Sequence, residues 1–292
     1  MWLKNFVNGL KQIPNFMKDI FTWGDGRRSK RNFTIYDLLN LKGKKKLTQV
    51  NCGNEIEVQA AVEANIDLLI CLGRDIKMIR ANAPHHFITG AILEHEYYTK
   101  DDLLKASMMT LENGADAIYT SKNPHVVEYL AKESVPVMAH LGFIPVKSSW
   151  TGGIRGTAKT SKEAYKLYQQ FKDMENAGAV LVEAEVIAGD VLTEISKRTS
   201  IVTVSLGSGN GGDVNYLFMC DICGENEELP RHAIQYGNLL PFHQKIQKER
   251  IAAFREFKQD VITNKFPTKK YSISIEKKEL LNFKNYLKQK GT

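Results

Sequence analysis

Short apolar runs alternate with helical stretches along the chain from residue 47 onward. The runs are rich in Val, Ile and Leu, and this pattern is typical of buried strands joined by helices. Eight strands are predicted: Leu47–Val50, Asp67–Cys71, Phe87–Ile92, Ala115–Tyr119, Val135–Ala139, Ala179–Ala184, Ile201–Ser205 and Tyr216–Met219. The clearest helices between them are predicted at Glu55–Ala64, Asp101–Asn113, His125–Lys132, Ser161–Ala177 and Asp190–Arg198.

This alternation predicts an α/β fold. Strands that are apolar on both faces must be covered on both faces, and eight of them with intervening helices are most simply arranged as a closed (β/α)8 TIM barrel. An open doubly wound sheet is the alternative. In either fold, residues that act on a substrate lie just beyond the carboxyl ends of the strands, so those positions are the first candidates for a site.

Charge divides the chain into three regions. The formal net charge is +7, but residues 1–46 carry +8, residues 47–243 carry −9 and residues 244–292 carry +8. We therefore expect an amphipathic, basic extension, then the barrel as the catalytic domain, then a basic helical extension with helices over Gln244–Val261 and Glu276–Lys288. The basic ends lack a nucleic-acid recognition motif and favour solvated or assembly surfaces, so we expect a homo-oligomer and no nucleic-acid partner.

The stretch Met1–Trp23 is amphipathic, with aromatic and aliphatic residues among lysines. It predicts a helical arm that packs on a sister subunit, and this interpretation is favoured over contact with a membrane surface because Pro14 interrupts the helix. Four cysteines are too few for a disulfide framework in a chain of 292 residues. Together with the lack of a signal peptide, they favour a cytoplasmic protein.

Two strand ends carry acid–base groups. His140 follows the fifth predicted strand directly, where an imidazole can bind the carbonyl or carboxylate of a small oxo acid, or serve as a structural histidine. Glu183 and Glu185 close the sixth strand and lie two residues apart, so they share one side of it. Their proximity or burial would raise one carboxyl pKa toward the range of a general acid or base.

Two glycine-containing loops are weaker candidates. The loop Leu206–Asp213, which contains Gly207 and Ser208, follows the seventh strand, where barrels often bind anions through backbone N–H groups; a tight turn is the alternative. The segment Thr151–Thr157 contains Arg155 between glycines and could close over the site as a lid.

Several of these segments together resemble one known family. Pro136-Val-Met-Ala-His-Leu-Gly-Phe-Ile-Pro145 is similar to P-V-M-G-H-L-G-L-T-P, and Val182–Glu185 and Leu206–Gly209 follow in matching order and spacing. The chain thus resembles the ketopantoate hydroxymethyltransferases (3-methyl-2-oxobutanoate hydroxymethyltransferases) of the phosphoenolpyruvate mutase and isocitrate lyase superfamily. The similarity runs from about Arg31 to Asp221.

The resemblance implies a TIM-barrel transferase of pantothenate biosynthesis. Its reaction adds a one-carbon unit from 5,10-methylenetetrahydrofolate to a small 2-oxo acid through an enolate. The family's histidine of the oxo-acid pocket corresponds to His140. Its catalytic glutamate corresponds to Glu185, which would exchange the proton on the carbon beside the ketone.

The family's Mg²⁺ ligands are not matched. Its V-G-D-S motif corresponds to Cys71-Leu-Gly-Arg-Asp75. Aligning the glycines puts Arg74 on the metal-binding aspartate and Asp75 on the serine, whereas an alignment without a gap puts Gly73 on the aspartate. The second metal-binding aspartate corresponds to Ala91. Asp75 and Glu94 could form an altered Mg²⁺ site, or a guanidinium could bind the substrate carboxylate instead.

Other positions of the family's pocket also differ. A lysine and a glutamate correspond to Tyr119 and Ser121. Predicted substrate-binding residues are therefore Arg74, Asp75, Tyr119, Ser121, Arg155, Gly207 and Ser208. Two alternatives stay open: a lyase or hydrolase that cleaves a C–C or C–P bond in another small carboxylic acid, and a non-catalytic relative with a role in assembly.

Overall fold

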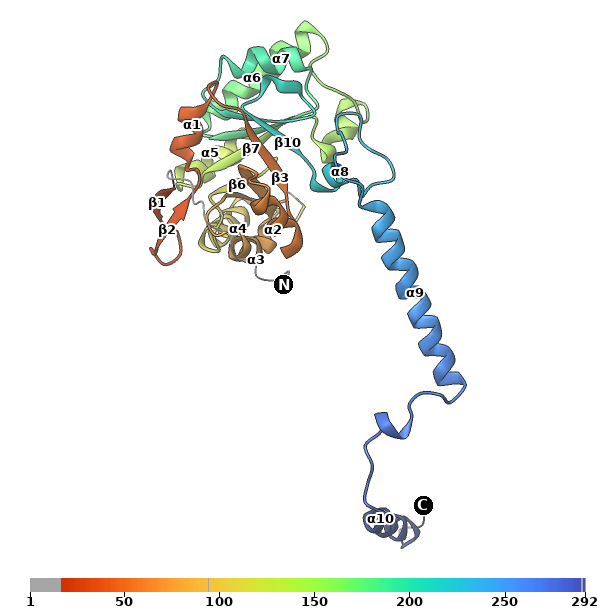
Figure 1. Cartoon of the computed structure of the whole chain (residues 1–292). Coiled ribbons are helices and arrows are strands. Elements are labelled where there is room, and N and C mark those ends of the chain that lie inside the picture. The colour runs from red at the N-terminus through yellow and green to blue at the C-terminus, as the bar shows by residue number, and fades with distance from the viewer. Residues whose placement is uncertain (1–16, 94, 290, 292) are drawn as a thin grey trace. The chain divides into compact units, whose positions relative to one another are not determined.

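The structure is a computed structural model that describes residues 17–93, 95–289 and 291. The chain divides into two compact units, Met1–Gly237 and Asn238–Thr292. The first unit contains a closed barrel of eight parallel strands, with β10 paired to β3 (Figure 1). The predicted (β/α)8 barrel is therefore confirmed. Its strands are β3 (Leu47–Asn51), β4 (Leu68–Leu72), β5 (Phe87–Ala91), β6 (Ala117–Tyr119), β7 (Val137–Gly142), β8 (Leu181–Glu185), β9 (Val202–Leu206) and β10 (Val214–Leu217).

Helices follow most of the strands. They are α2 (Glu55–Glu63), α3 (Ile76–Asn82), α4 (Lys100–Glu112), α5 (Pro124–Lys132), α6 (Ser161–Asn176) and α7 (Gly189–Ser196). After β9 there is only a short 3₁₀ helix, Gly209–Gly211, and after β10 comes the five-residue α8 (Met219–Cys223). The last two βα units are therefore abbreviated.

Local sequence fixes where the longer helices begin and end. Thr99 and Thr160 cap α4 and α6, since each side chain accepts a hydrogen bond from the backbone N–H three residues later. Gly114 and Gly178 follow the ends of the same helices with φ of +115° and +88°. Residues with a Cβ rarely adopt this left-handed conformation, so a glycine at each position allows the helix to end there.

Two apolar layers pack against the strands of the barrel, one on each face. One lies inside the barrel near the amino ends of its strands, and the other lies between the strands and the helices. The inner layer includes Leu47, Leu68, Phe87, Ala117, Met138, Leu181, Val202 and Val214. The outer layer joins Leu69, Ile88, Ile118 and Val182 to Ile79, Leu103, Phe171 and Leu192 on the helices. Burial on both faces explains why the strands are apolar throughout rather than alternating.

The segment before the barrel differs from the predicted helical arm. Lys18–Phe21 forms β1, which pairs antiparallel with β2 (Arg28–Arg31), and α1 (Ile35–Leu41) follows. The helical prediction for this part of Met1–Trp23 is wrong, because alternating side chains in a hairpin also separate apolar from basic residues. Residues 1–16 of the predicted arm lie outside the described residues.

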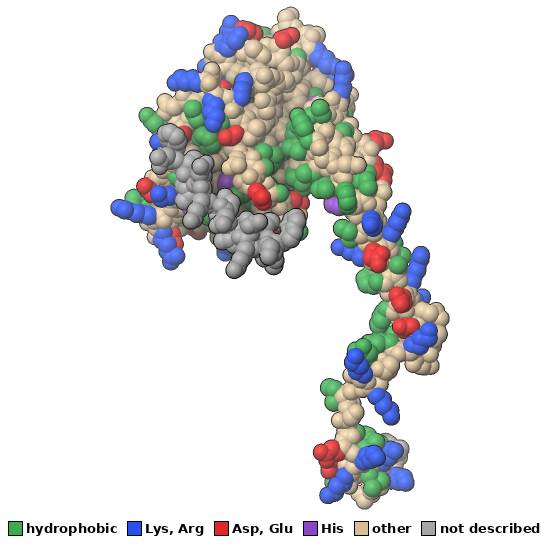
Figure 2. Space-filling model, viewed as in Figure 1, with side chains coloured by type: hydrophobic (Ala, Val, Ile, Leu, Met, Phe, Trp, Pro, Cys, Tyr) green, Lys and Arg blue, Asp and Glu red, His purple; other side chains and the backbone are tan. Residues whose placement is uncertain are grey.

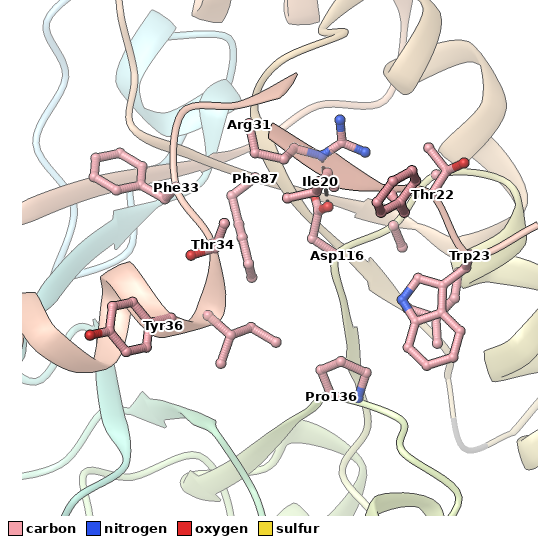
Figure 3. A pocket seen from close by; sticks show the side chains of 15 residues that line it. Ile20, Thr22, Trp23, Arg31, Phe33, Thr34, Tyr36, Phe87, Asp116 and Pro136 are labelled. Carbon is pink, nitrogen blue, oxygen red and sulfur yellow. Dashed lines mark hydrogen bonds and ion pairs between the residues drawn. The ribbon is translucent and has the colours of Figure 1, made fainter. Parts of the chain in front are cut away.

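A buried ion cluster lies at the amino end of the barrel. Asp116 accepts from Arg31 Nε and from the Arg80 guanidinium at 2.7 Å each, and from the Ile88 amide. Figure 3 shows Arg31 and Asp116 beside a cavity of about 310 Å³, which is lined by β1, α1 and the starts of barrel strands. Since catalytic groups of such barrels lie at the opposite end, this cavity is not the candidate active site.

The second unit consists of α9 (Leu240–Ile262), a 3₁₀ helix (Lys269–Tyr271) and α10 (Lys277–Gln289). The two helices predicted in this region are present, and no described residue in them is buried. Lysine and arginine side chains alternate with hydrophobic ones along this unit (Figure 2). Among the described residues, no helix is long and apolar enough to cross a membrane.

The ion cluster predicts a large cost for losing Asp116. Asp116→Ala leaves two guanidinium groups at the base of the barrel without their counter-charge, and Arg31 is only 3% exposed. We expect a loss of about 3–5 kcal/mol in the free energy of unfolding, measured by urea denaturation. Asp25→Ala, which removes an exposed ion pair with Arg27, is the control and should change little. Equal stability of both variants would contradict this role of Asp116.

Candidate active site

The barrel interior becomes polar toward the carboxyl ends of the strands. Strand registers place Gln49 and Thr89 directly above the inner apolar layer. The next level toward the carboxyl ends holds Tyr119, Glu183 and Tyr216, which come from alternate strands. Side chains from alternate strands share a level in such barrels. The acid–base groups thus lie at the end where (β/α)8 barrels carry their chemistry.

His140 lies between a phenol and two carboxylates. Its Nδ1 is 2.6 Å from the Tyr119 hydroxyl oxygen, and its Nε2 is 3.0 Å from Glu185 Oε2 and 3.8 Å from Glu183 Oε1. The parallel register explains these contacts, since His140 pairs with Glu183 and Gly142 pairs with Glu185 on the neighbouring strand. The predicted candidates His140, Glu183, Glu185 and Tyr119 are therefore brought together.

Gly142 allows β7 and β8 to approach at this point. Its φ is +96°, and a Cβ added there would lie 2.3 Å from the backbone oxygen of Glu185 and 2.7 Å from Ile187 Cγ1. The Phe143 amide also donates to that oxygen at 2.8 Å. A larger residue would have to push apart the strand ends that hold His140 and Glu185.

Burial and mutual contact shift the pKa values of two of these groups. Burial is the main cause that raises the pKa of Glu183 to about 7; the imidazole opposes this rise and the Glu185 charge adds to it. For His140, burial disfavours the charged ring, but the contact with Glu185 and the charges of both carboxylates outweigh it and raise its pKa. Near neutral pH, this arrangement favours a charged imidazole and a Glu183 carboxyl that exchanges its proton readily.

Several buried polar atoms inside the barrel have no hydrogen-bond partner within the described part of the chain. They are Gln49 Nε2, Thr89 Oγ1, Ser121 Oγ and His140 Nε2, whose 3.0 Å approach to Glu185 lacks hydrogen-bond geometry. Buried polar groups are nearly always paired, with protein, water or ligand. A few polar groups that converge inside the barrel are typical of a site for a small polar ligand.

Lys147 also lies at this end, and sequence reasoning missed it. It belongs to the 3₁₀ helix Pro145–Thr151 after β7, is half-buried, and donates from Nζ to the backbone oxygen of Ser121 at 3.0 Å. Only its place seven residues after His140 could have drawn attention to it. The Ser121 side chain beside it is buried, and its Oγ has no described partner.

The predicted cations make other contacts. Arg74 donates to Glu96 at 2.9 Å with 64% of its side chain exposed, and Arg155 donates to Glu163 at 2.9 Å. Arg155 Nε also donates to the Thr151 oxygen, at 2.9 Å. Their roles as ligands for a substrate carboxylate stay predictions.

The glycine-rich loop makes a tight turn at Gly207, whose φ is +66°. The Ser208 hydroxyl donates to the Ala184 oxygen at 2.7 Å and accepts from the Ile187 amide at 2.8 Å. These bonds hold the loop against the segment that carries Glu185. The predicted substrate contacts of Gly207 and Ser208 stay predictions.

The Mg²⁺ ion implied by the resemblance does not fit the residues at the ends of β4 and β5. Ala91 offers no ligand atom, and Arg74 brings a positive charge where an aspartate would bind the metal. Asp75 precedes α3, and Glu94 lies outside the described residues. Within the described residues, His140, Glu183 and Glu185 form the one group of three possible ligands, on the other strands β7 and β8.

This fold and site define a (β/α)8-barrel enzyme with a buried imidazole–carboxylate pair at the carboxyl ends of its strands. The family model for ketopantoate hydroxymethyltransferase matches residues 74–269. The chain belongs to this family.

Curated relatives agree with this assignment. A 3-methyl-2-oxobutanoate hydroxymethyltransferase of Staphylothermus marinus is 26% identical and covers 85% of this chain and 98% of its own. One of Kosmotoga olearia is 26% identical over 80% of this chain and 94% of its own. Among solved structures, a 2,3-dimethylmalate lyase of the PEP mutase/isocitrate lyase superfamily has a TM-score of 0.48 at 10% identity, with coverages of 82% and 93%.

The raised pKa of Glu183 predicts a pH-dependent effect on stability. Its folded value of about 7 exceeds the ordinary 4.5, so the folded state loses stability relative to the unfolded state as pH rises through this range. Glu183→Gln removes this penalty. Its free energy of unfolding relative to wild type should rise by about 1–2 kcal/mol from pH 5.5 to 8.5, measured by urea denaturation.

Glu194→Gln is the matched control, because the ion pairs of this exposed residue lower its pKa and it stays ionised across the same range. Its stability difference from wild type should not change with pH between these limits. A Glu183→Gln difference that is equally flat would show that Glu183 is not buried as an acid with a raised pKa.

Proposed function

We propose that this chain removes the proton from C3 of 3-methyl-2-oxobutanoate and joins the resulting enolate to a one-carbon unit, giving ketopantoate. The observation that carries the proposal is the 3.0 Å contact between Glu185 and the buried His140 at the mouth of the barrel. Membership of the family and the names of the relatives support the substrate and the reaction.

Glu185 is the proposed base. Its carboxylate takes the C3 proton, the C–H electron pair becomes the C2–C3 double bond, and the carbonyl π pair moves onto the ketone oxygen. Positioned bases of this kind contribute rate factors of about 10²–10⁴. Glu185 ends β8 and is more exposed than Glu183, which suits a group that must reach a bound ligand.

His140 and Tyr119 are the proposed stabilisers of the enolate oxygen. With the ring charged, Nδ1–H donates to the Tyr119 oxygen at 2.6 Å, which turns the phenol hydrogen away from the ring; in the proposal, this hydrogen bonds to the ketone oxygen once the substrate is bound. A donor aimed at a developing oxyanion in a buried site is worth about 2.7–4 kcal/mol of barrier. In this chain, these groups take on part of the charge stabilisation that a metal ion provides.

The one-carbon donor in the proposal is 5,10-methylenetetrahydrofolate, as the resemblance implies. Water adds to the methylene carbon while both of its C–N bonds to the folate break, so that formaldehyde is released and the two folate nitrogens take up the protons of the water. Carbon C3 of the enolate then forms a bond to the formaldehyde carbon, whose C=O π pair moves onto its oxygen and takes a proton to give the hydroxymethyl group. We further propose that the protein assembles as a homo-oligomer in the cytoplasm. The exposed Phe254 and Phe257 on α9 support assembly, and light scattering of the purified chain measures it.

Exchange of the C3 proton with solvent deuterium tests the base directly. The wild type should exchange this proton of 3-methyl-2-oxobutanoate in D₂O without any folate, as followed by proton NMR. Glu185→Gln keeps the size of the side chain but cannot accept the proton, so the rate should fall by about 10²–10⁴.

Glu194→Gln, on the surface of α7, is the control and should exchange at the wild-type rate. Absence of exchange in a folded wild-type protein would refute the proposal. Turnover of another small carboxylic acid that depends on Glu185 would then favour the lyase or hydrolase alternative, and a cellular phenotype unaffected by Glu185→Gln would favour an assembly role.

Chelation tests the proposed role of the side chains. Since Ala91 and Arg74 do not offer the family's metal ligands, treatment with EDTA should leave the exchange rate unchanged. Loss of exchange in EDTA, with recovery on addition of Mg²⁺ or Mn²⁺, would contradict this expectation. It would instead indicate an ion at His140, Glu183 and Glu185.

A further inference from the structure

The geometry points to a carboxylate-binding subsite formed by Lys147 and the hydroxyl of Ser121. It would bind the carboxylate of the 2-oxo acid and hold its ketone toward Tyr119 and His140. This inference rests on the proposed function and adds the group that recognises the acid.

The charges of the site require such a group. Glu183 and Glu185 lie within 3.8 Å of the single imidazole, so two acidic groups share one cation before an anionic ligand arrives. A further positive charge must therefore bind the carboxylate of the ligand. This chain lacks the family's ligands for a metal ion, so another residue must supply that charge. The amino group of Lys147 is a strong donor of the required sign.

Position connects Lys147 to the acid–base groups. The Nζ of Lys147 is 3.0 Å from the backbone oxygen of Ser121, and Ser121 follows Tyr119 by two residues. The ladder between β6 and β7 continues to Thr120, whose amide donates to the Met138 oxygen, so Ser121 lies beyond Tyr119 on the same side of this strand. Tyr119 in turn contacts His140 at 2.6 Å. The linked residues therefore form a row across the mouth of the barrel, in the order Lys147, Ser121, Tyr119 and His140.

Ser121 supplies the second, independent observation. Its side chain is 3% exposed, and its Oγ has no hydrogen-bond partner in the described chain. A buried hydroxyl without a partner costs stability unless water or a ligand pairs with it. A carboxylate held by the Lys147 amino group can accept this hydrogen bond with its other oxygen.

Arg74 and Arg155 are less suited to this role. The side chains of Arg74 and Arg155 are 64% and 41% exposed, whereas Lys147 is half-buried. Solvent weakens the attraction between an exposed cation and a carboxylate. Lys147 instead lies at the end of the strand pair that carries Tyr119 and His140.

Binding measurements on the full chain test the subsite. Titration calorimetry compares 3-methyl-2-oxobutanoate with 3-methyl-2-butanone, a neutral ketone without the carboxylate. Lys147→Gln should raise the Kd of the acid by about 10- to 100-fold, since hydrogen bonds to charged groups are worth this much. It should leave the Kd of the ketone unchanged, whereas Lys147→Arg should restore most of the affinity for the acid.

Ser121→Ala should weaken binding of the acid severalfold while keeping the fold, as checked by circular dichroism. Lys132→Gln, an exposed lysine of α5 paired with Glu128, is the control and should bind the acid as wild type does. Arg74→Gln and Arg155→Gln are measured beside them. If either weakens acid binding and Lys147→Gln does not, the subsite assignment is overturned.

The outcomes separate this inference from the proposed function. A wild type that exchanges the C3 proton while Lys147→Gln and Ser121→Ala bind the acid normally contradicts the subsite alone. A wild type that neither binds the acid nor exchanges its proton contradicts both. Loss of acid binding in Lys147→Gln, with unchanged binding of the ketone, supports the subsite.

Discussion

One buried imidazole between two carboxylates and a phenol determines the electrostatics of the candidate active site. His140 loses its hydration on folding, and the contact with Glu185 together with the negative charges of both carboxylates outweighs this loss and favours its protonated form. Burial, helped by the charge of Glu185, raises the pKa of Glu183 to about 7, and the contact with His140 Nδ1 orients the Tyr119 hydroxyl. Each of these groups depends on the others, so the site acts as one coupled unit rather than as independent residues.

The two ends of the barrel differ in polarity, and this difference makes the arrangement possible. Apolar side chains fill the amino end of the barrel, and the Arg31–Asp116–Arg80 cluster closes it outside the strands. Polar groups without partners gather at the carboxyl end instead, where a ligand can pair with them. Stability and chemistry are thus assigned to opposite ends of the same strands, as in other barrels of this class.

The sequence predicts the barrel well because each of its eight strands is a short apolar run and five of the intervening helices have a clear helical pattern. It also predicts His140 and Glu185 as site residues from their places near strand ends: Glu185 ends β8, and His140 lies within β7, two residues before the end of that strand. It could not show that Tyr119 contacts His140, because this contact depends on the register between β6 and β7. Lys147 escaped attention because a lysine in a loop looks like solvated charge, and β1 escaped because Lys18–Phe21 fits a hairpin and an amphipathic helix equally well.

Gly142 gives this site an unusual dependence on the backbone. The contact between Glu185 and His140 joins the paired strands β7 and β8, and a Cβ on Gly142 of β7 would lie only 2.3 Å from the backbone oxygen of Glu185. Alanine scanning identifies functional positions by removing side-chain atoms. Here the addition of a single methyl group at Gly142 would instead press on the backbone of Glu185 and on Ile187, and so disturb the contact between Glu185 and His140 without removing an atom from either.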